Sequence, residues 1–263
     1  MHALQVGFKD LGKLLSWTQS ELIILAAGPG VSKTGMAINF VWQLAQTGHW
    51  CGFFTLEMSR EQLTRRFMAV MGRINSHRMN QGRMTAEEWV RFAQLQKQFE
   101  AMPIWIDDTP SLSIADIRAR ARRQHGTGKL DFLAVDYLQL TRPKTRGRSR
   151  EEEVAEVSRG LKALAKELHI PVLAISSLNR KCEERTDKRP IMADLRESGA
   201  IEFDADLILF LYRDEVYRKN SPDKGIAEIE VAKHKNGPIG LVKMAYQGEC
   251  YRFKDLAEES SHS

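Results

Sequence analysis

The sequence predicts one doubly wound α/β domain whose sheet is mostly parallel, with antiparallel strands at its C-terminal edge. From residue 22 to residue 212, short apolar runs alternate with amphipathic stretches, a pattern typical of parallel strands joined by helices. Beyond residue 212, two short runs flank Asn236, Gly237 and Pro238, which predicts a hairpin-like antiparallel pair. The chain has 263 residues and is 43% hydrophobic, which suffices for the core of one large domain.

The first predicted strand, residues 22–27, is wholly apolar and leads into a loop that contains glycine. Helical periodicity resumes at Met36, directly after Lys33 and Thr34. Strand, glycine-containing loop, Lys-Thr and helix is the layout of a P-loop, in which backbone N–H groups cradle phosphates, the lysine reaches the β- and γ-phosphates and the hydroxyl binds Mg²⁺. The candidate nucleotide-binding residues are Gly28, Pro29, Gly30, Val31, Ser32, Lys33, Thr34 and Gly35.

Two positions of this loop depart from the pattern G-x-x-x-x-G-K-[ST]. When the pattern is aligned on Lys33, Ala27 occupies the first glycine position and Ser32 the second. If the second position needs a positive φ, the Cβ of Ser32 costs about 1–2 kcal/mol. The alternative interpretation of this stretch is a glycine-rich turn followed by an incidental Lys-Thr pair.

Two further predicted strands end in acidic residues. Residues 51–55 lead into Glu57, and residues 130–136 end in Asp136. The carboxyl ends of parallel strands border the crevice in which α/β proteins bind ligands. An aspartate at such a strand end, after a P-loop, commonly orients Mg²⁺, although a turn or cap residue is the alternative. Thr34 and Asp136 are therefore the candidate Mg²⁺ ligands.

The remaining elements follow from periodicity and capping signals. We expect helices after Ser59 and after the capping box Thr85–Glu88, and a basic helix after Ser113, with its arginines exposed. Further expected elements are strands at 103–107, 171–176, 207–212, 226–233, 241–246 and 251–253, and helices at 60–71, 85–99, 114–124 and 151–168. We expect one domain over residues 1–257 and a disordered tail over residues 258–263.

Composition restricts the compartment and the partners. No run approaches the ~20 apolar residues of a membrane span, and the N-terminus has no signal-peptide pattern. The three cysteines Cys51, Cys182 and Cys250 are widely spaced, which fits neither a disulfide framework nor a zinc site. We therefore expect a cytoplasmic protein without a membrane partner. The net charge of +5 permits nucleic-acid binding, and cations concentrate at 141–150 and 182–190, although solvated loops are the alternative.

Strings from residue 6 to residue 253 together resemble one family. They are GFKDLGKLLS, FFTLEMS, PIWIDDTPSLSIADIRARARR, FLAVDYLQL, EVSRGLKALAKELHIPVLAIS, RPIMADLRESGAIEFDADLILFLYRDEVY and AKHKNGPIG. The chain is similar to the C-terminal motor domain of DnaB-type replicative helicases, in the RecA-like superfamily of P-loop NTPases. This resemblance implies a homo-hexamer or nucleotide-dependent oligomer that hydrolyses ATP with Mg²⁺ at subunit interfaces, moves along single-stranded DNA and has a helicase loader or a primase as a further partner.

The resemblance also implies roles for individual residues. Glu57 would polarise the attacking water, and Lys233 and Lys235 would reach the γ-phosphate of a neighbouring subunit. Ser177 takes the position of the γ-phosphate sensor. The implied catalytic residues are Glu57, Lys33, Lys235 and Lys233. Two loops would face a central DNA channel, where phosphates favour cations; their candidate DNA-binding residues are Arg142, Lys144, Arg146, Arg148, Arg150, Arg180 and Arg185.

Several features depart from the family pattern. Ser32 replaces a glycine, Ser177 replaces a glutamine, and Lys235 stands at the position of an arginine finger, where lysine lacks the planar fork. We also expect the N-terminal helical domain and linker helix of the family to be missing, since only MHALQ precedes the resemblance, and one residue is missing near Ser16. These departures keep open a degenerate member that binds nucleotide or DNA with little hydrolysis. A recombination or signalling ATPase is a weaker alternative, disfavoured by the string at residues 189–217.

Overall fold

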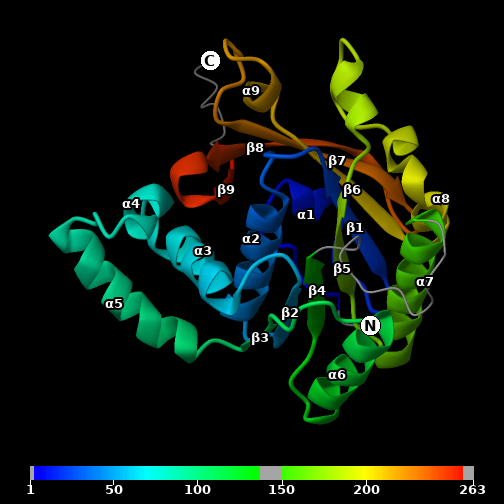
Figure 1. Ribbon diagram of the computed structural model, residues 1–263, viewed down its shortest axis with the longest axis horizontal. Coiled ribbons are helices and arrows are strands. Elements are labelled where there is room, and N and C mark those ends of the chain that lie inside the picture. The colour runs from blue at the N-terminus through cyan, green and yellow to red at the C-terminus, as the bar shows by residue number, and fades with distance from the viewer. Residues whose placement is uncertain (1–2, 137–149, 257–263) are drawn as a thin grey trace.

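The fold is built on one nine-stranded sheet with the order β3-β2-β4-β5-β1-β6-β7-β8-β9. The computed structural model describes residues 3–136 and 150–256 (Figure 1). The strands from β3 to β6 in this order are parallel, whereas β7, β8 and β9 are antiparallel to their neighbours. The strands are β1 Leu22–Ala27, β2 Cys51–Thr55, β3 Ile104–Asp107, β4 Phe132–Asp136, β5 Val172–Ser177, β6 Leu207–Tyr212, β7 Ile226–His234, β8 Gly240–Gln247 and β9 Arg252–Asp255.

Helices cover both faces of the parallel part of the sheet (Figure 1). One face packs against α2 and α3, and the other packs against α6, α7 and α8. This arrangement confirms the predicted doubly wound α/β fold. The helices are α1 Leu11–Leu14, α2 Lys33–Gln46, α3 Arg60–Gly72, α4 Ser76–Asn80, α5 Ala86–Glu100, α6 Ile114–Gly126, α7 Arg150–Leu168, α8 Gly199–Asp204 and α9 Asp214–Tyr217, and short 3₁₀ segments occur at Arg180–Glu184, Met192–Ser198 and Gly248–Cys250.

The central strand β1 is apolar throughout because it is buried on both faces. Ile23 and Leu25 belong to the core that also contains Phe40 of α2. Leu22 and Ile24 belong to the core on the opposite face, with Leu161 of α7. Successive side chains of a strand point to opposite faces, so a strand between two helical layers needs apolar residues at every position.

The predicted helix starts are confirmed at three positions by capping boxes. In each box, the side chain of the capping residue accepts a hydrogen bond from the backbone N–H of the third helical residue. The side chain of that third residue in turn accepts a hydrogen bond from the backbone N–H of the capping residue. The pairs are Ser59 with Gln62, Thr85 with Glu88 and Ser113 with Asp116. The arginines of α6 form ion pairs, Arg120 with Asp107 and both Arg118 and Arg122 with Glu167. Arg122 is exposed, as predicted, whereas Arg118 and Arg120 are half-buried because these ion pairs hold them against the neighbouring elements.

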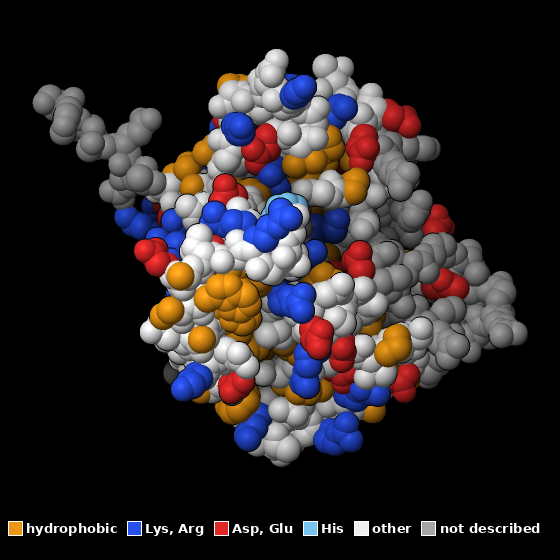
Figure 2. Space-filling model, turned by 60° about the vertical axis from the view of Figure 1, so that its left-hand side comes forward, with side chains coloured by type: hydrophobic (Ala, Val, Ile, Leu, Met, Phe, Trp, Pro, Cys, Tyr) orange, Lys and Arg blue, Asp and Glu red, His pale blue; other side chains and the backbone are white. Residues whose placement is uncertain are grey.

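The helices α4 and α5 project beside the sheet, and α5 carries exposed apolar side chains. They lie on the left of Figure 1, the side that comes forward in Figure 2, where hydrophobic side chains are exposed among Lys and Arg side chains. On α5, 48% of Trp89 and 61% of Val90 is exposed. Within residues 3–136 and 150–256, we find no helix with the length and apolar character required to cross a bilayer.

Candidate functional site

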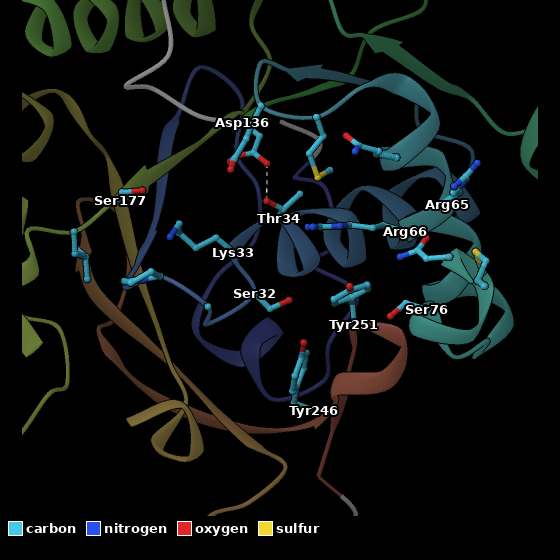
Figure 3. Close-up of a pocket in the computed structure, with 18 residues that line it drawn as sticks. Ser32, Lys33, Thr34, Arg65, Arg66, Ser76, Asp136, Ser177, Tyr246 and Tyr251 are labelled. Carbon is cyan, nitrogen blue, oxygen red and sulfur yellow. Dashed lines mark hydrogen bonds between the residues drawn. The ribbon is translucent and has the colours of Figure 1, made fainter. Parts of the chain in front are cut away.

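A cavity of about 900 Å³ opens at the carboxyl edge of the parallel strands. Figure 3 shows that side chains from distant parts of the chain point into it. The loop after β1 and the first turn of α2 form one wall, and the ends of β4 and β5 form another. The sheet order explains this convergence, because β5 lies between β4 and β1 and brings their carboxyl ends to the same edge.

Ser32 adopts the left-handed backbone conformation at the base of the loop. Its φ is 79° and its ψ is 44°, so the position does require a positive φ, as the P-loop pattern predicts for its second glycine. Gly35 accommodates the extra side chain, because a Cβ at Gly35 would collide with the Ser32 hydroxyl oxygen. Ser32 is therefore accepted by the loop at the expense of backbone strain.

The Lys33 amine is folded back over the loop. Its Nζ donates to the carbonyl oxygens of Ala27 at 3.0 Å and of Gly28 at 3.1 Å. Burial lowers the pKa of Lys33, and the negative charges of Asp136 and Glu57 oppose this effect. The amine thus lies at the loop edge, where an anionic phosphate offers a stronger acceptor than two neutral carbonyls.

Thr34 and Asp136 are in direct contact within the cavity (Figure 3). The Thr34 hydroxyl donates to Asp136 Oδ2 at 2.6 Å. The pKa of Asp136 is raised to about 6, mainly by burial and also by the negative charge of Glu57, while the Thr34 hydrogen bond and the Lys33 charge oppose the shift. Within the described residues there is no group of three or more His, Cys, Asp or Glu side chains that could hold a metal ion. A hydroxyl beside a carboxylate fits Mg²⁺, which keeps several waters and takes phosphate oxygens as further ligands.

Glu57 lies above the end of β2, at the rim of the same cavity. Its position follows from a tight turn in which Thr55 Oγ1 donates to the Met58 carbonyl oxygen at 2.9 Å. Thr55 pairs with Asp136 across β2 and β4, so the two acids occupy neighbouring strand ends. The exposed Glu57 side chain has the placement expected of a group that contacts a water molecule beside a bound phosphate.

The P-loop is also contacted from outside the cavity by the segment around α9. A Cβ at Gly28 would collide with the Tyr217 hydroxyl oxygen. The Tyr217 ring is stacked on Tyr212, with ring centroids 5.5 Å apart and 9° between the planes. Gly28 is thus required by a close approach of a side chain, whereas Val31 points into the core and does not line the cavity.

Several cavity residues have no signal in the sequence. The cavity is also lined by Arg65 and Arg66 of α3, by Tyr246 of β8 and by Tyr251, which directly precedes β9 (Figure 3). The Arg66 guanidinium lies 5.1 Å from the centre of the Tyr251 ring. Burial raises the pKa of Tyr246, and a hydrogen bond from Ser32 opposes this. Tyr246 lies in β8 and Tyr251 directly before β9, far from the P-loop in sequence, so no local motif connects them with it.

Ser177 and the two candidate trans-acting lysines occupy opposite ends of the sheet. Ser177 pairs with Ala27 and lines the cavity. Lys235 instead pairs with Asp206 at 3.0 Å, and Asp206 also accepts from the Leu22 N–H, at the start of β1. The six residues of β1 separate the two ends by roughly 20 Å. The Lys233 amine likewise binds the Glu202 carbonyl oxygen near that amino edge, so neither lysine reaches the cavity of its own chain.

The candidate DNA-binding residues have different outcomes. Arg185 forms a two-pronged ion pair with Asp194, at 2.6 and 2.8 Å, and also donates to the Arg189 carbonyl oxygen. The structure therefore assigns this guanidinium a structural contact. Arg150 and Arg180 lie in α7 and in a 3₁₀ segment, but their side chains are outside the described part of the structure. The others, Arg142, Lys144, Arg146 and Arg148, lie outside the described residues altogether, as does the predicted tail.

Comparisons with known proteins agree with this geometry. Residues 3–255 match the family model described as the DnaB-like helicase C terminal domain. The replicative DNA helicase DnaB of Geobacillus stearothermophilus is 44% identical over 256 residues, which is 96% of this chain and 56% of that protein. The DnaB of Haemophilus influenzae is 46% identical over 261 residues, with 97% and 56% coverage. The chain thus spans little more than half the length of these relatives.

Solved structures are similar over the same range. A structure described as a DnaB-like replicative helicase and its interactions with primase has a TM-score of 0.94 at 33% identity, covering 97% of this chain and 62% of that one. A second structure, described as an ATPase domain, has a TM-score of 0.93 at 33% identity, covering 97% of this chain and 92% of that one. The family match over nearly the whole chain, together with the P-loop cavity, shows that this chain belongs to the DnaB-like helicase C-terminal domain family.

Proposed function

We propose that this chain is the ATP-hydrolysing motor domain of a DnaB-type DNA helicase. The observation that carries the proposal is the contact of Thr34 with Asp136 inside the P-loop cavity, with Glu57 on the adjacent strand end. If Lys33 and Thr34 were an incidental pair after a glycine-rich turn, the burial of Asp136 against the Thr34 hydroxyl would not be expected. The family match and the structural likeness to an ATPase domain support the same assignment.

Different residues of the cavity would bind the phosphates, hold Mg²⁺ and activate the attacking water. The loop amides and Lys33 hold the β- and γ-phosphates, and Tyr246, Tyr251 and Arg66 border the space left for the rest of the nucleotide. Thr34 and Asp136 would hold Mg²⁺, which supplies positive charge against the phosphate oxygens. Glu57 orients and polarises the attacking water, and Ser177 lies beside the γ-phosphate end of the loop, at the strand neighbouring β1.

The wider activity extends the proposal to an assembly. Lys233 and Lys235 lie at the opposite end of the sheet from their own cavity, so they would serve the nucleotide of another copy in a ring. The loop at residues 141–150 and Arg180 would contact single-stranded DNA. A cytoplasmic location and a helicase loader or primase as partner complete this proposal, and one of the similar structures is described with primase.

Steady-state turnover of Mg²⁺-ATP, with and without single-stranded DNA, tests this function. We expect turnover above that of Lys33→Ala and Glu57→Gln, with stimulation by DNA. Glu57→Gln should still bind ATP, because it alters the group that acts on water and leaves the phosphate loop intact. Turnover equal to that of Lys33→Ala at saturating ATP and DNA would contradict the motor assignment.

A second function, nucleotide binding with little hydrolysis, is favoured by one specific observation. Lys235 replaces the usual arginine and is held by Asp206 on its own chain. A lysine lacks the planar fork of arginine, and this amine is already paired, so both features weaken the stabilisation of the transition state at the nucleotide of another copy. ATP binding that survives while turnover falls to the Lys33→Ala level would support this alternative. Turnover that doubles or more when Lys235→Arg is introduced would identify the lysine as the limiting group.

A further inference from the structure

An arginine of the segment after β6 lies against the outer side of the phosphate loop. Only 12% of the Arg213 side chain is exposed. Its Nη1 is 3.5 Å from the carbonyl oxygens of both Gly30 and Val31, and its Nη2 binds the Glu215 carboxylate at 2.6 Å. Its Cζ lies 3.9 Å from the centre of the Tyr246 ring, where the cation is attracted to the aromatic face. Arg213 therefore joins Tyr246 of β8 to the phosphate loop.

The Tyr246 side chain is fixed by further contacts. Its ring packs on Phe253 with ring centroids 4.6 Å apart, and only 7% of the residue is exposed. Its backbone N–H donates to the Gly225 carbonyl oxygen at 2.7 Å, and the Gly225 N–H donates to Glu215 at 3.1 Å. Because Glu215 is also the ion-pair partner of Arg213, the backbone and the ring of Tyr246 belong to one connected network.

The hydroxyl end of this fixed side chain reaches the strained serine of the loop. Tyr246 points toward Ser32, and both residues line the cavity (Figure 3). Burial raises the pKa of Tyr246, and a hydrogen bond from the Ser32 hydroxyl and the positive charge of Arg213 oppose this rise. On its other side the Ser32 hydroxyl lies against Gly35, where an added Cβ would collide with it. The Ser32 hydroxyl is thus confined between the first turn of α2 and Tyr246.

A serine in the left-handed conformation needs a restraint of this kind. The φ of 79° at Ser32 is unfavourable for a residue with a Cβ, so an unrestrained loop would populate other conformations. Those conformations would turn the loop N–H groups away from a phosphate, and the apparent affinity falls in proportion to the fraction of competent molecules. A change of φ would also carry the Ser32 hydroxyl away from Tyr246. The hydrogen bond therefore favours the strained conformation over the relaxed ones.

We propose that Tyr246 is a positioning residue for nucleotide binding, whose hydroxyl holds Ser32 in the left-handed conformation and so keeps the phosphate loop in its binding shape. This inference rests on the proposed function, since it deepens the assignment of the cavity as a nucleotide site. Tyr246 acts through Ser32. Glycine adopts the same conformation without the Cβ penalty, so a loop with glycine at residue 32 has no need of the tyrosine hydroxyl.

A double-mutant cycle tests the coupling of the two hydroxyl groups. Calorimetric titration of Mg²⁺-ADP into the full chain would compare the parent, Tyr246→Phe, Ser32→Ala and the double variant. ADP keeps the β-phosphate that the loop binds and is not consumed by ATP hydrolysis. Tyr246→Phe keeps the ring and its contacts, and Ser32→Ala keeps the strained Cβ. We expect each single substitution to raise the dissociation constant about threefold to tenfold, and the double variant to bind no more weakly than the weaker single variant.

The tyrosine substitution is then repeated with glycine at residue 32. Ser32→Gly combined with Tyr246→Phe should bind Mg²⁺-ADP within about twofold of Ser32→Gly alone, because the strain that the hydroxyl opposes is absent. Tyr212→Phe is the matched control. It removes a tyrosine hydroxyl that donates to Asp214 at 2.7 Å, and it should bind as the parent does.

Three results would overturn the proposal. Parent-like binding by Tyr246→Phe, or additive losses in the double variant, would show that the two hydroxyl groups are not coupled. An equal loss from Tyr246→Phe with serine and with glycine at residue 32 would show that Tyr246 contacts the nucleotide directly or supports the fold in general. If Tyr246→Phe does not fold, parent-like binding by Ser32→Ala overturns the proposal instead.

Lys33→Ala, titrated beside these variants, separates this inference from the proposed function. A parent that binds Mg²⁺-ADP more tightly than Lys33→Ala, with no sensitivity to Tyr246→Phe, contradicts only the role of Tyr246. A parent that binds no more tightly than Lys33→Ala contradicts the nucleotide site itself, and the role of Tyr246 with it.

Discussion

At the scale of single residues, the phosphate loop combines a strained serine with a lysine and a buried acid. Ser32 keeps the left-handed conformation that glycine adopts without penalty, and its side chain fits only because residue 35 has no Cβ. The sequence alone shows that a glycine is replaced. Only the backbone angle shows that the replacement is strained, because a motif gives residue types and no conformations.

Replacing Ser32 by glycine should stabilise the protein. Relief of the left-handed Cβ contributes about 1–2 kcal/mol, and the greater freedom of glycine in the unfolded chain removes about half of this gain. We expect a net increase of about 0.5–1 kcal/mol in the free energy of unfolding, measured by urea denaturation. Ser111→Gly, at another serine with positive φ, is the control and should give a similar gain without altering ATP affinity. No gain at Ser32 would contradict the assigned strain.

Asp136 should give the apo protein an unusual pH dependence. Its pKa is raised from 3.8 to about 6, mainly by burial, so the folded state favours the protonated acid. The contribution of Asp136 to stability is therefore fully present below its unfolded pKa and is lost as the pH rises towards and through 6. Relative to Asp136→Asn without Mg²⁺, the parent should lose about 2 kcal/mol between about pH 4 and about pH 8. Urea denaturation at both pH values measures this difference, and a pH-independent difference would contradict the shift.

At the scale of elements, apolar runs and capping signals predict most of the fold. The strands β1, β2 and β6 occupy the predicted residues, and the three capping boxes start α3, α5 and α6. Periodicity works here because burial on two faces leaves a continuous apolar run. It cannot place Tyr251 beside Arg66, or Tyr217 against Gly28, since these contacts depend on the order of strands in the sheet.

The contact between α9 and the phosphate loop can be tested by a pair of substitutions. Gly28→Ala places a Cβ against the Tyr217 hydroxyl, and stacking on Tyr212 prevents the ring from moving away easily. We expect a loss of about 1–3 kcal/mol in stability and weaker ATP binding. Adding Tyr217→Phe removes the oxygen and should restore most of both, whereas Tyr217→Phe alone should have little effect. Unfolding and ATP titration of all four proteins would reveal additive effects if the contact is absent.

Substitutions in the segment at residues 180–190 can show whether Arg185 has a structural role or a DNA-binding role. Arg185→Gln leaves Asp194, which is 5% exposed, without its ion-pair partner. The expected result is a loss of about 2 kcal/mol in stability, with a change in single-stranded DNA affinity no larger than that of Lys188→Gln. Lys188→Gln removes the same charge from the same segment and keeps the ion pair intact. A DNA-binding defect with parent-like stability would instead favour the role implied by the family resemblance.

At the scale of the whole molecule, the two ends of the parallel sheet have different chemistry. The carboxyl edge carries the cavity with the phosphate loop, whereas the amino edge holds Lys235 on Asp206. The sequence predicts the residues at both ends through motif positions and resemblance. Their separation across β1 follows only from the register of β1 with β5 and β6. This polarity is what makes a single copy unable to bring Lys235 to its own nucleotide.

The most direct measurement is a calorimetric titration of ATP into the chain, in Mg²⁺ and in EDTA, beside Lys33→Ala and Asp136→Asn. We expect one site per chain whose affinity is higher in Mg²⁺ than in EDTA. Lys33→Ala should weaken binding in both buffers, because it removes a phosphate contact. Asp136→Asn should remove the Mg²⁺ dependence, because it removes a metal ligand and keeps the loop. Binding that is unaffected by both substitutions, or absent in Mg²⁺, would contradict the assignment of the cavity as the Mg²⁺-ATP site.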